Sequence, residues 1–410
     1  MLPVPAGEFC SWQQGRLQVP DHPVVGCMPG DGIGPEVWEA ARLVLDTAVE
    51  RAYRGKRQIA WWELPMGEAA YQASGEYLPL ATLEALRKCK VGIKGPFTTP
   101  VGGGFRSVNV ALRQALDLYA CIRPVRWFPG LPSPLRNPEQ VDLVIFRENT
   151  EDVYMGIEWA SGSPEARRLI EFLRDALGVT VPEDAGLGLK PISPYASRRL
   201  VRKAISYALE RGRKSVTLMH KGNIMKFTEG AFREWGYEVA KEFGAAVVRE
   251  DELAGAAADG RVVIKDRIAD NMFQQLLTRP GEYDVIAAPN LNGDYLSDAA
   301  AALVGGLGVA PGANVSDECA VFEATHGSAP KYAGKGRANP TSLILSGAML
   351  LEHLGWNEAA GLVVRAVEGV IRRGTVTQDL ARMLGKAEAV ATGEFAEAVA
   401  RAIEAGVPDA

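Results

Sequence analysis

The sequence TTPVGGGFRSVNVALR, residues 98–113, leads from a glycine-rich turn into the start of an amphipathic helix. It places Thr98, Ser107, Asn109 and Arg113 within sixteen positions. Hydroxyl groups and an arginine fork delivered at a helix start are typical of an anion-binding site. A glycine-rich loop with solvated arginines would explain the same residues equally well, so the rest of the chain must decide between the two.

The composition is that of an ordinary globular protein of 410 residues, with 47% apolar and 23% charged residues, which predicts two or three domains. A net charge of -5 argues against a general attraction to nucleic acid or acidic membranes. The five cysteines are scattered without a Cys-x-x-Cys pair, as in proteins of a reducing compartment. We see no signal peptide and no apolar run of the ~20 residues that span a membrane. We therefore expect a cytoplasmic protein with neither nucleic acid nor membrane as a partner.

Apolar runs and helical periodicities alternate along the chain, which predicts an α/β fold with a largely buried sheet. The expected strands are 24–28, 91–95, 141–146, 215–220, 245–250, 283–288 and 319–325, with a short β-like segment at 178–181. The expected helices are 35–48, 81–90, 164–177, 197–209, 228–243, 266–277 and 341–354, followed by two more. The glycines of PGDGIG, residues 29–34, do not have the G-x-G-x-x-G spacing, which favours a structural turn over a dinucleotide fingerprint.

Dense polar clusters follow four of the expected strands, which end near Gly95, Phe146, His220 and Ala288. In open α/β sheets, ligands bind beyond the carboxyl ends of strands. One such cluster could arise by chance, but four of them predict a shared cleft.

Arg113, Arg123 and Arg147 belong to these clusters and predict a ligand with several negative charges. Asp294 and Asp298 are four residues apart, which places both carboxylates on one face of a helix. With Asp270 on another helix, they would suit a hard cation such as Mg²⁺ or Mn²⁺. The alternative is that Asp294 caps a helix and the other two aspartates are solvated.

Two residues are candidates for proton transfer beside an anion and a metal. Lys221 ends a strand and is either a proton carrier or a surface lysine, while Tyr154 is either an acid or a packing residue. His326 is the one histidine in a loop with other polar residues. The sequence contains neither a G-x-S-x-G elbow nor a glycine loop followed by Lys-Ser or Lys-Thr, which argues against a serine hydrolase and a P-loop NTPase.

Long segments closely resemble the bacterial-type NADP-dependent isocitrate dehydrogenases of the isocitrate/isopropylmalate dehydrogenase family. They include GDGIGPEV (30–37), TTPVGGGFRSVNVALRQALDLYACIRPVR (98–126), VIFRENTEDVYMGIEW (144–159), HKGNIMKFTEGAF (220–232) and FEATHGSAPKYAG (322–334), with a further match over 268–314. The resemblance extends from about Val24 to Arg382. It implies large and small α/β domains that share a central sheet system, with a clasp insertion, in a fold distinct from the standard Rossmann fold.

The resemblance also implies the roles of individual residues. Isocitrate would contact Thr98, Ser107, Asn109, Arg113, Arg123 and Arg147, with Tyr154 and Lys221 catalytic and Asp270, Asp294 and Asp298 binding Mg²⁺ or Mn²⁺. NADP would contact Thr98, His326, Gly327, Lys331, Tyr332, Asn339, Gln378, Arg382 and Arg279. Lys221, Asp270 and Arg279 would come from the neighbouring subunit of a homodimer. Gln378 stands where the closest relatives carry a tyrosine, which weakens the NADP prediction slightly.

The implied reaction is the oxidative decarboxylation of isocitrate to 2-oxoglutarate and carbon dioxide in the tricarboxylic acid cycle, through a metal-chelated alkoxide, hydride transfer and loss of the β-carboxylate. The implied domains are a large one (1–118 and 305–410, with the cofactor loop 326–339), a small one (119–151 and 194–304) and an intersubunit clasp (152–193). The matching serine of some relatives is phosphorylated, which makes a regulatory kinase acting on Ser107 a further expected partner.

Three alternatives remain open. A sister enzyme of the same fold would act on isopropylmalate, homoisocitrate or tartrate, although Ser107 and Asn109 suit a third carboxylate better than an apolar substituent. A non-catalytic regulatory subunit is disfavoured by the complete set of Lys221, Tyr154 and three aspartates. A nucleic-acid binder is disfavoured by the acidic balance of charge.

Overall fold

The computed structural model describes residues 3–13, 15–98, 107–253, 255–386 and 388–406. These residues contain an eleven-stranded mixed sheet with strand order β11-β12-β10-β13-β7-β6-β14-β15-β5-β3-β4. Its strands are β3 (Val24–Met28), β4 (Ala60–Glu63), β5 (Val91–Lys94), β6 (Ala120–Arg126), β7 (Asp142–Glu148), β10 (Ser215–His220), β11 (Val247–Arg249), β12 (Val262–Ile268), β13 (Val285–Ala288), β14 (Pro311–Val315) and β15 (Ala320–Ala324). The predicted α/β class is confirmed.

Two groups of parallel strands make up the ends of this sheet. Strands β11, β12, β10, β13 and β7 are parallel to one another, and so are β15, β5, β3 and β4. Strands β6 and β14 lie between the groups and pair antiparallel with each other and with their outer neighbours. The carboxyl ends of β5 and β15 therefore point in the opposite direction to those of β7, β10 and β13.

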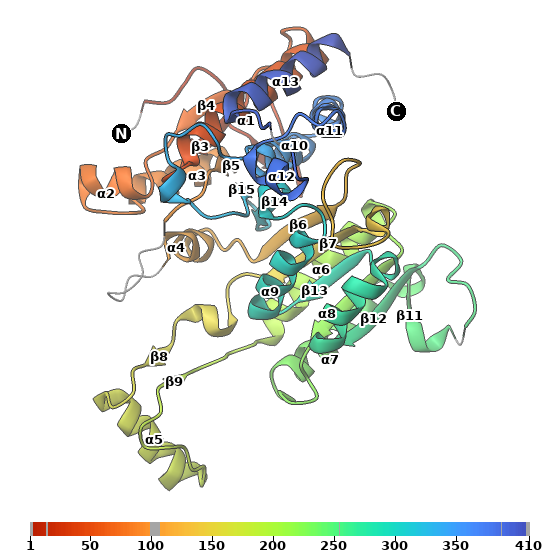
Figure 1. Cartoon of the computed structure of the whole chain (residues 1–410). Helices are drawn as coiled ribbons and strands as arrows, with labels where there is room; N and C mark the ends of the chain where they lie inside the picture. The colour runs from red at the N-terminus through yellow and green to blue at the C-terminus, as the bar shows by residue number, and fades with distance from the viewer. Residues whose placement is uncertain (1–2, 14, 99–106, 254, 387, 407–410) are drawn as a thin grey trace.

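Helices cover both halves of the sheet (Figure 1). In the half that contains both chain ends, α1 packs against α10, α11 and α13, while α6, α7, α8 and α9 pack on the strands of the other half. The helices are α1 (Gly34–Tyr53), α2 (Glu68–Ser74), α3 (Leu80–Cys89), α4 (Val108–Ala115), α5 (Pro164–Leu177), α6 (Pro194–Glu210), α7 (Glu229–Glu242), α8 (Ala269–Thr278), α9 (Asn290–Ala302), α10 (Thr341–His353), α11 (Asn357–Arg372), α12 (Gln378–Met383) and α13 (Thr392–Ala405). Within the described ranges, none of these helices has the length and apolarity to cross a membrane.

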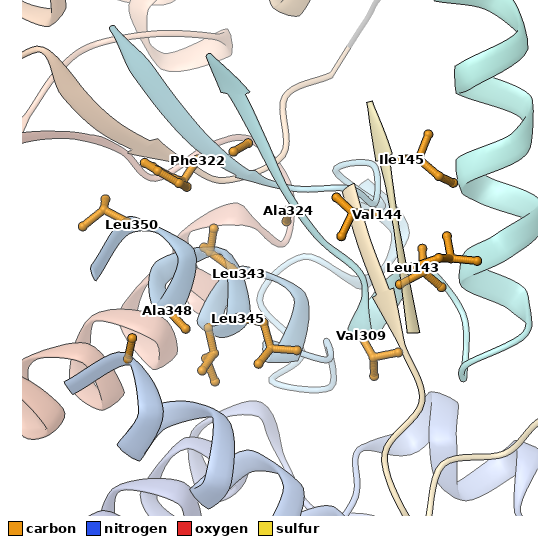
Figure 2. Close-up of a cluster of buried hydrophobic side chains, with 14 of the residues drawn as sticks. Leu143, Val144, Ile145, Val309, Phe322, Ala324, Leu343, Leu345, Ala348 and Leu350 are labelled. Carbon is orange, nitrogen blue, oxygen red and sulfur yellow. The ribbon is translucent and has the colours of Figure 1, made fainter. Parts of the chain in front are cut away.

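The hydrophobic core continues across the sheet from one half to the other. Figure 2 shows part of it, with Leu143, Val144 and Ile145 of β7 toward one side of the view and Phe322 of β15 and Leu345 of α10 toward the other. All five side chains are at most 5% exposed. An uninterrupted apolar strand such as β7 is expected where helices cover both faces of a sheet, which is the arrangement found here.

An arm extends away from this body (Figure 1). It contains α5 and a two-stranded antiparallel sheet of β8 (Glu158–Trp159) and β9 (Leu187–Gly188). The helix at 164–177 was predicted correctly, but the β-like segment at 178–181 is wrong, because these residues form no strand. Gly178 instead ends α5 in a left-handed conformation, with φ of 66°. A strand is defined by pairing with a neighbour, as β8 pairs with β9, and residues 178–181 have no such partner.

The remaining differences from the predicted elements concern strands that pair with distant neighbours. The predicted helix 266–277 begins only at Ala269, because residues 262–268 pair with β10 and β11 as strand β12. Strands β4, β6 and β14 were not predicted, and a separate hairpin of β1 (Ser11–Gln13) and β2 (Arg16–Gln18) precedes the sheet. Short strands are stabilised by their partners, so their own residues give a weak signal.

The turn at residues 29–34 is structural, as its glycine spacing predicted. Gly30 has a φ of 100°, and a Cβ on it would lie 2.4 Å from the carbonyl oxygen of Pro96. Asp31 accepts hydrogen bonds from the backbone N–H groups of Glu68 (2.9 Å) and Thr98 (2.9 Å). The turn thus holds the end of β5, and with it Thr98, in place.

Candidate active site

Three buried arginines converge on one face of the sheet. Arg147 of β7 is opposite Cys121 of β6, and Arg123 lies two residues further along β6 on the same face. Arg113 approaches from α4. Burial, followed by the nearby charge of Arg113, lowers the pKa of Arg147. Such a concentration of buried positive charge is costly unless anions compensate it.

The helix α9 supplies part of that compensation. Asp298 accepts a hydrogen bond from Arg123 at 3.0 Å, and Asp294 accepts hydrogen bonds from Arg147 and from the hydroxyl of Tyr154. The two aspartates are one turn apart on the same helix, as predicted, and Asp294 lies inside the helix and does not cap it. Burial, the largest influence, and the neighbouring Asp294 raise the pKa of Asp298.

Several polar atoms of this cluster have no partner within the protein. Among the described residues, the buried Arg113 Nε, Arg123 Nε, Arg147 Nη2 and Asn109 Oδ1 atoms make no hydrogen bond. Buried polar atoms in native proteins are nearly always satisfied, so a group of such atoms in one place calls for an explanation. Three unpaired guanidinium nitrogens from three converging elements fit an anionic ligand that is bound between them.

A cavity of about 470 Å³ opens beside the arginines. Its lining includes Thr98, Asn109, Arg113, Arg123, His326 and Gly327. The Thr98 hydroxyl is 2.7 Å from that of Ser328, which brings the end of β5 and the loop after β15 together. Ser107 begins α4 and is half-buried, while the glycines of the stretch at 98–113 fall on residues 99–106, outside the described residues.

Lys94 and Glu323 also line this cavity, and neither was predicted from the sequence. Glu323 of β15 is 4% exposed and pairs with Lys94 Nζ at 2.7 Å and with Arg113 Nη2 at 2.9 Å. The sequence did indicate a buried ion pair, because Glu323 is a charged residue within an otherwise apolar strand, and such a residue is rarely buried without a partner. Burial would raise the pKa of Glu323, but Lys94 and Arg113 outweigh it, so the pKa falls well below its usual range.

We expect Glu323→Gln to lower the free energy of unfolding by about 3–5 kcal/mol at pH 7, because it leaves Lys94 and Arg113 buried without their counter-ion. The depressed pKa means that the ionised Glu323 stabilises the fold above its unfolded pKa of about 4.3 and loses this effect as the pH falls. The difference in free energy of unfolding between wild type and variant should therefore decrease by about 1.4 kcal/mol for each pH unit below that value. Urea unfolding at pH 7 and pH 3.5 measures both quantities.

The control is Glu352→Gln, which removes the partner of Arg211 from an exposed ion pair of 2.8 Å. A surface ion pair contributes about 0–1 kcal/mol to the free energy of unfolding. We expect the difference in this quantity between wild type and the control to show no such decrease as the pH falls. A Glu323→Gln variant no less stable than this control would contradict the assigned role of Glu323.

Tyr154 carries its proton at neutral pH. Burial and the hydrogen bond that its hydroxyl donates to Asp294 raise its pKa to about 12. The guanidinium carbon of Arg147 lies 4.7 Å from the centre of its ring. Tyr154 therefore belongs to the arginine–aspartate cluster as a protonated acid, where sequence spacing alone left a packing role open.

Lys221 and Asp270 form a second group. Lys221 follows β10, Asp270 lies in the first turn of α8, and their side chains form an ion pair. Neither side chain has a hydrogen bond or ion pair with Tyr154, Asp294 or Asp298 in the described part of the chain. Over the same residues, no group of three or more His, Cys, Asp or Glu side chains could hold a metal ion.

The predicted cofactor residues are divided between two cavities and three sites outside them. His326 and Gly327 line the cavity beside the arginines, and burial lowers the pKa of His326. Gln378 and Arg382 line a second cavity of about 700 Å³, together with Lys335, Arg337 and Lys386, three cations that the sequence reading did not single out. The other predicted residues lie outside this lining: Lys331 and Tyr332 on an exposed turn, Asn339 buried against Asp379 (2.9 Å), and Arg279 at the end of α8.

These features define the class of the protein. The glycines that follow β3 lack the G-x-G-x-x-G spacing, and arginines pair with two carboxylates on α9. Four of the eleven residues that line the second cavity are lysine or arginine, which suits a phosphate group. The fold and the site together are those of an α/β protein that binds a small polyanion beside a carboxylate pair.

Comparison with known proteins identifies the family. A family model described as isocitrate/isopropylmalate dehydrogenase matches residues 24–399, and the chain belongs to this family. It is 58% identical to an isocitrate dehydrogenase [NADP] of Archaeoglobus fulgidus, over 96% of each chain. It is 55% identical to the enzyme of the same name from Pseudomonas aeruginosa, over 93% of this chain and 94% of that one.

Solved structures show the same fold. The crystal structure of an isocitrate dehydrogenase from Methylococcus capsulatus matches with a TM-score of 0.77 and 40% identity, covering 93% of this chain and 99% of that one. A second match is the TT0538 protein from Thermus thermophilus, with a TM-score of 0.79 and 35% identity, covering 96% of this chain and 71% of that one. The predicted fold family is thus confirmed.

Proposed function

We propose that this protein catalyses the NADP-dependent oxidative decarboxylation of isocitrate to 2-oxoglutarate and carbon dioxide. The observation that carries the proposal is the set of unpaired guanidinium nitrogens on Arg113, Arg123 and Arg147 beside the two aspartates of α9. Relatives that cover nearly the whole chain at 52–58% identity carry the name isocitrate dehydrogenase [NADP]. A tricarboxylate is the ligand class that three convergent arginines suit.

The arginines would exchange partners when the substrate binds. Arg123 is paired with Asp298, and Arg147 with Asp294. Substrate carboxylates would take over these guanidinium groups and free the two aspartates to bind a cation. Ser107 and Asn109, at the start of α4, would bind the third carboxylate, which isopropylmalate and tartrate lack.

The aspartates of α9 fit a divalent metal such as Mg²⁺ or Mn²⁺, with Asp270 of a neighbouring subunit completing the ligand set. When bound, the metal would polarise the substrate hydroxyl and NADP would accept the hydride. Tyr154, which keeps its proton at neutral pH, would return a proton after carbon dioxide leaves. Lys221, from the neighbouring subunit, would support that transfer.

For NADP we propose the loop 326–339 and the second cavity. Thr98, His326, Gly327 and Asn339 would bind the nucleotide, and Lys331, Tyr332, Gln378, Arg382 and the Arg279 of a second copy would hold its 2′-phosphate. The basic lining of the second cavity supports this assignment, because Lys335, Arg337 and Lys386 add positive charge around Gln378. The missing tyrosine at position 378 is thereby compensated.

We also propose a homodimer with shared active sites, since Lys221 and Asp270 pair with each other and, among the described residues, make no hydrogen bond or ion pair with Asp294 or Asp298 of their own chain. The projecting arm supports an intersubunit clasp over 152–193 (Figure 1). The opposed directions of the two strand groups support a large domain (1–118 and 305–410) and a small domain (119–151 and 194–304). A regulatory kinase acting on Ser107 remains part of the proposal.

The test is the formation of reduced nicotinamide with Mg²⁺ or Mn²⁺ across isocitrate, homoisocitrate and isopropylmalate, with NADP and NAD in parallel. We expect turnover with isocitrate and NADP. Turnover with isopropylmalate or homoisocitrate alone would assign the sister activity, and absence of any signal with isocitrate would overturn the proposal.

We expect Arg382→Ser to lower kcat/KM for NADP by about 10–100-fold, because one charged hydrogen bond to the 2′-phosphate is worth about 1.5–3 kcal/mol. The value for NAD, which lacks this phosphate, should change little. Steady-state kinetics with both nucleotides measure the ratio. Arg401→Ser, on an exposed part of α13 outside the cavity lining, serves as the matched control and should alter neither value.

A further inference from the structure

A buried carboxylate holds the backbone of Lys221. Glu229, the first residue of α7, is fully buried and accepts a hydrogen bond from the Lys221 N–H at 2.5 Å. The same oxygen accepts a hydrogen bond from Asn292 in the first turn of α9 at 2.7 Å. Its other carboxylate oxygen lies 3.1 Å from Lys190 Nζ. Glu229 thus joins the Lys221 loop to α9 and to the returning strand of the arm.

The charged chain continues beyond Lys190. Its ammonium group donates a hydrogen bond to Asp152 at 2.6 Å, and Asp152 is 1% exposed. The second oxygen of Asp152 accepts the N–H of Leu291, again in the first turn of α9, at 3.0 Å. Asp152 opens the 3-10 turn Asp152–Met155 that carries Tyr154. One lysine between two buried carboxylates therefore connects four segments that are distant in sequence.

The local conformations require this chain of contacts. Asp152 has a φ of 72°, which a residue other than glycine adopts only at a cost. On the other side, a Cβ on Gly222 would lie 2.5 Å from the Cα of Gly230, so the Lys221 loop packs tightly against the start of α7. The Gly222 N–H also donates to Nδ1 of His220 at 3.0 Å. With so little freedom in the loop, a displacement of Glu229 must move Lys221.

We propose that Asp152, Lys190 and Glu229 are positioning residues that fix the position of Lys221 relative to the Tyr154 turn and to α9. The proposal rests on the function proposed above, in which Lys221 serves the site of the neighbouring subunit while Tyr154 and Asp294 serve their own. The buried chain then couples the geometry of the two active sites of a dimer. None of its three members needs to touch the substrate.

The kinetic test compares Glu229→Gln and Lys190→Met with wild type in the intact dimer, well below the melting temperature of each variant. We expect kcat to fall about tenfold while the KM for isocitrate changes less than about threefold, because misplacing a catalytic group by ~1 Å costs up to 10²-fold. Lys190→Arg should recover most of the loss, since an arginine can still bridge both carboxylates.

The matched control is Lys265→Met. Lys265 lies on β12 in the same half of the sheet, is 8% exposed, and donates a hydrogen bond to the carbonyl of Glu282 at 2.7 Å. Its loss should lower the melting temperature without changing kcat. If Lys265→Met lowers kcat as much as the network variants do, Asp152, Lys190 and Glu229 have only a structural role. That result would overturn the proposal.

A second measurement does not depend on the reaction. Hydrogen–deuterium exchange of the backbone amides should become faster over 150–156, 217–226 and 288–296 in Lys190→Met, and stay unchanged there in Lys265→Met. Exchange and turnover within twofold of wild type in both network variants would overturn the proposal. A wild-type protein that does not oxidise isocitrate would overturn the proposed function instead, and the exchange data would still decide on the positioning role.

Discussion

Replacement of Lys221 by methionine is expected to reduce kcat by about 10²–10⁴-fold, the usual contribution of a positioned acid or base. The KM for isocitrate should change little, because the arginine cluster that we propose as the substrate site has no hydrogen bond or ion pair with Lys221 among the described residues. Methionine keeps the length of the side chain and removes the ammonium group. Lys226→Met is the control, since Lys226 is an exposed lysine in the same loop. Near-normal turnover of Lys221→Met would remove Lys221 from the mechanism.

Mixed dimers test whether Lys221 acts across the subunit boundary. A dimer of one Tyr154→Phe chain and one Lys221→Met chain should keep about half of the wild-type turnover if the sites are shared, because one site then contains both intact residues. Placing both changes on one chain and pairing it with wild type should impair both sites. If Lys221 serves its own chain, the two results are reversed.

Ser107→Asp is expected to weaken isocitrate binding by more than about 10²-fold, because a negative charge would face the carboxylate that α4 receives. Aspartate is a favourable residue at a helix start, so the fold should persist. NADP should bind with unchanged affinity, since the proposed 2′-phosphate residues lie elsewhere. Calorimetry with each ligand measures both effects.

The isosteric control is Ser107→Asn, which also suits a helix start but carries no charge. It should retain measurable isocitrate binding. Normal isocitrate affinity in Ser107→Asp would refute the assignment of Ser107 to the substrate, and with it the physical basis for inhibition by a kinase.

Much of the fold could be predicted because long elements with a clear apolar pattern can be recognised from the local sequence. The apolar run of β7 and the periodicity of α5 needed no tertiary information. By contrast, β12 carries Lys265 and Asp266 within its length, and the local pattern there was mistaken for the start of a helix. Its pairing with β10 is what makes it a strand, and a pairing partner cannot be read from local sequence.

The residues of the candidate site also divide into those that could be predicted from the sequence and those that could not. Spacing and resemblance were enough to predict the arginines, the α9 aspartates and Tyr154. In the structure, Arg123, Arg147 and Tyr154 donate hydrogen bonds to the two aspartates of that helix. The expectation that strand ends gather at one edge was only partly right, since β5 and β7 run in opposite directions and β6 bridges the offset between them. The contact between Lys190 and Glu229 joins residues with no recognisable spacing, so only the folded chain reveals it.

The order of strands in the sheet also determines the order in which the chain can fold as it leaves the ribosome. Strands β6 to β13 are consecutive in sequence, so the half of the sheet that contains them can assemble before synthesis ends. Strand β5 can pair with β3 at once, but its other edge must wait for β15, which pairs Lys94 with Glu323 more than two hundred residues later. Helix α1 must wait for α13, the last helix. The half of the sheet that contains the first strands is therefore completed last, and one edge of β5 has no partner strand until β15 has been made.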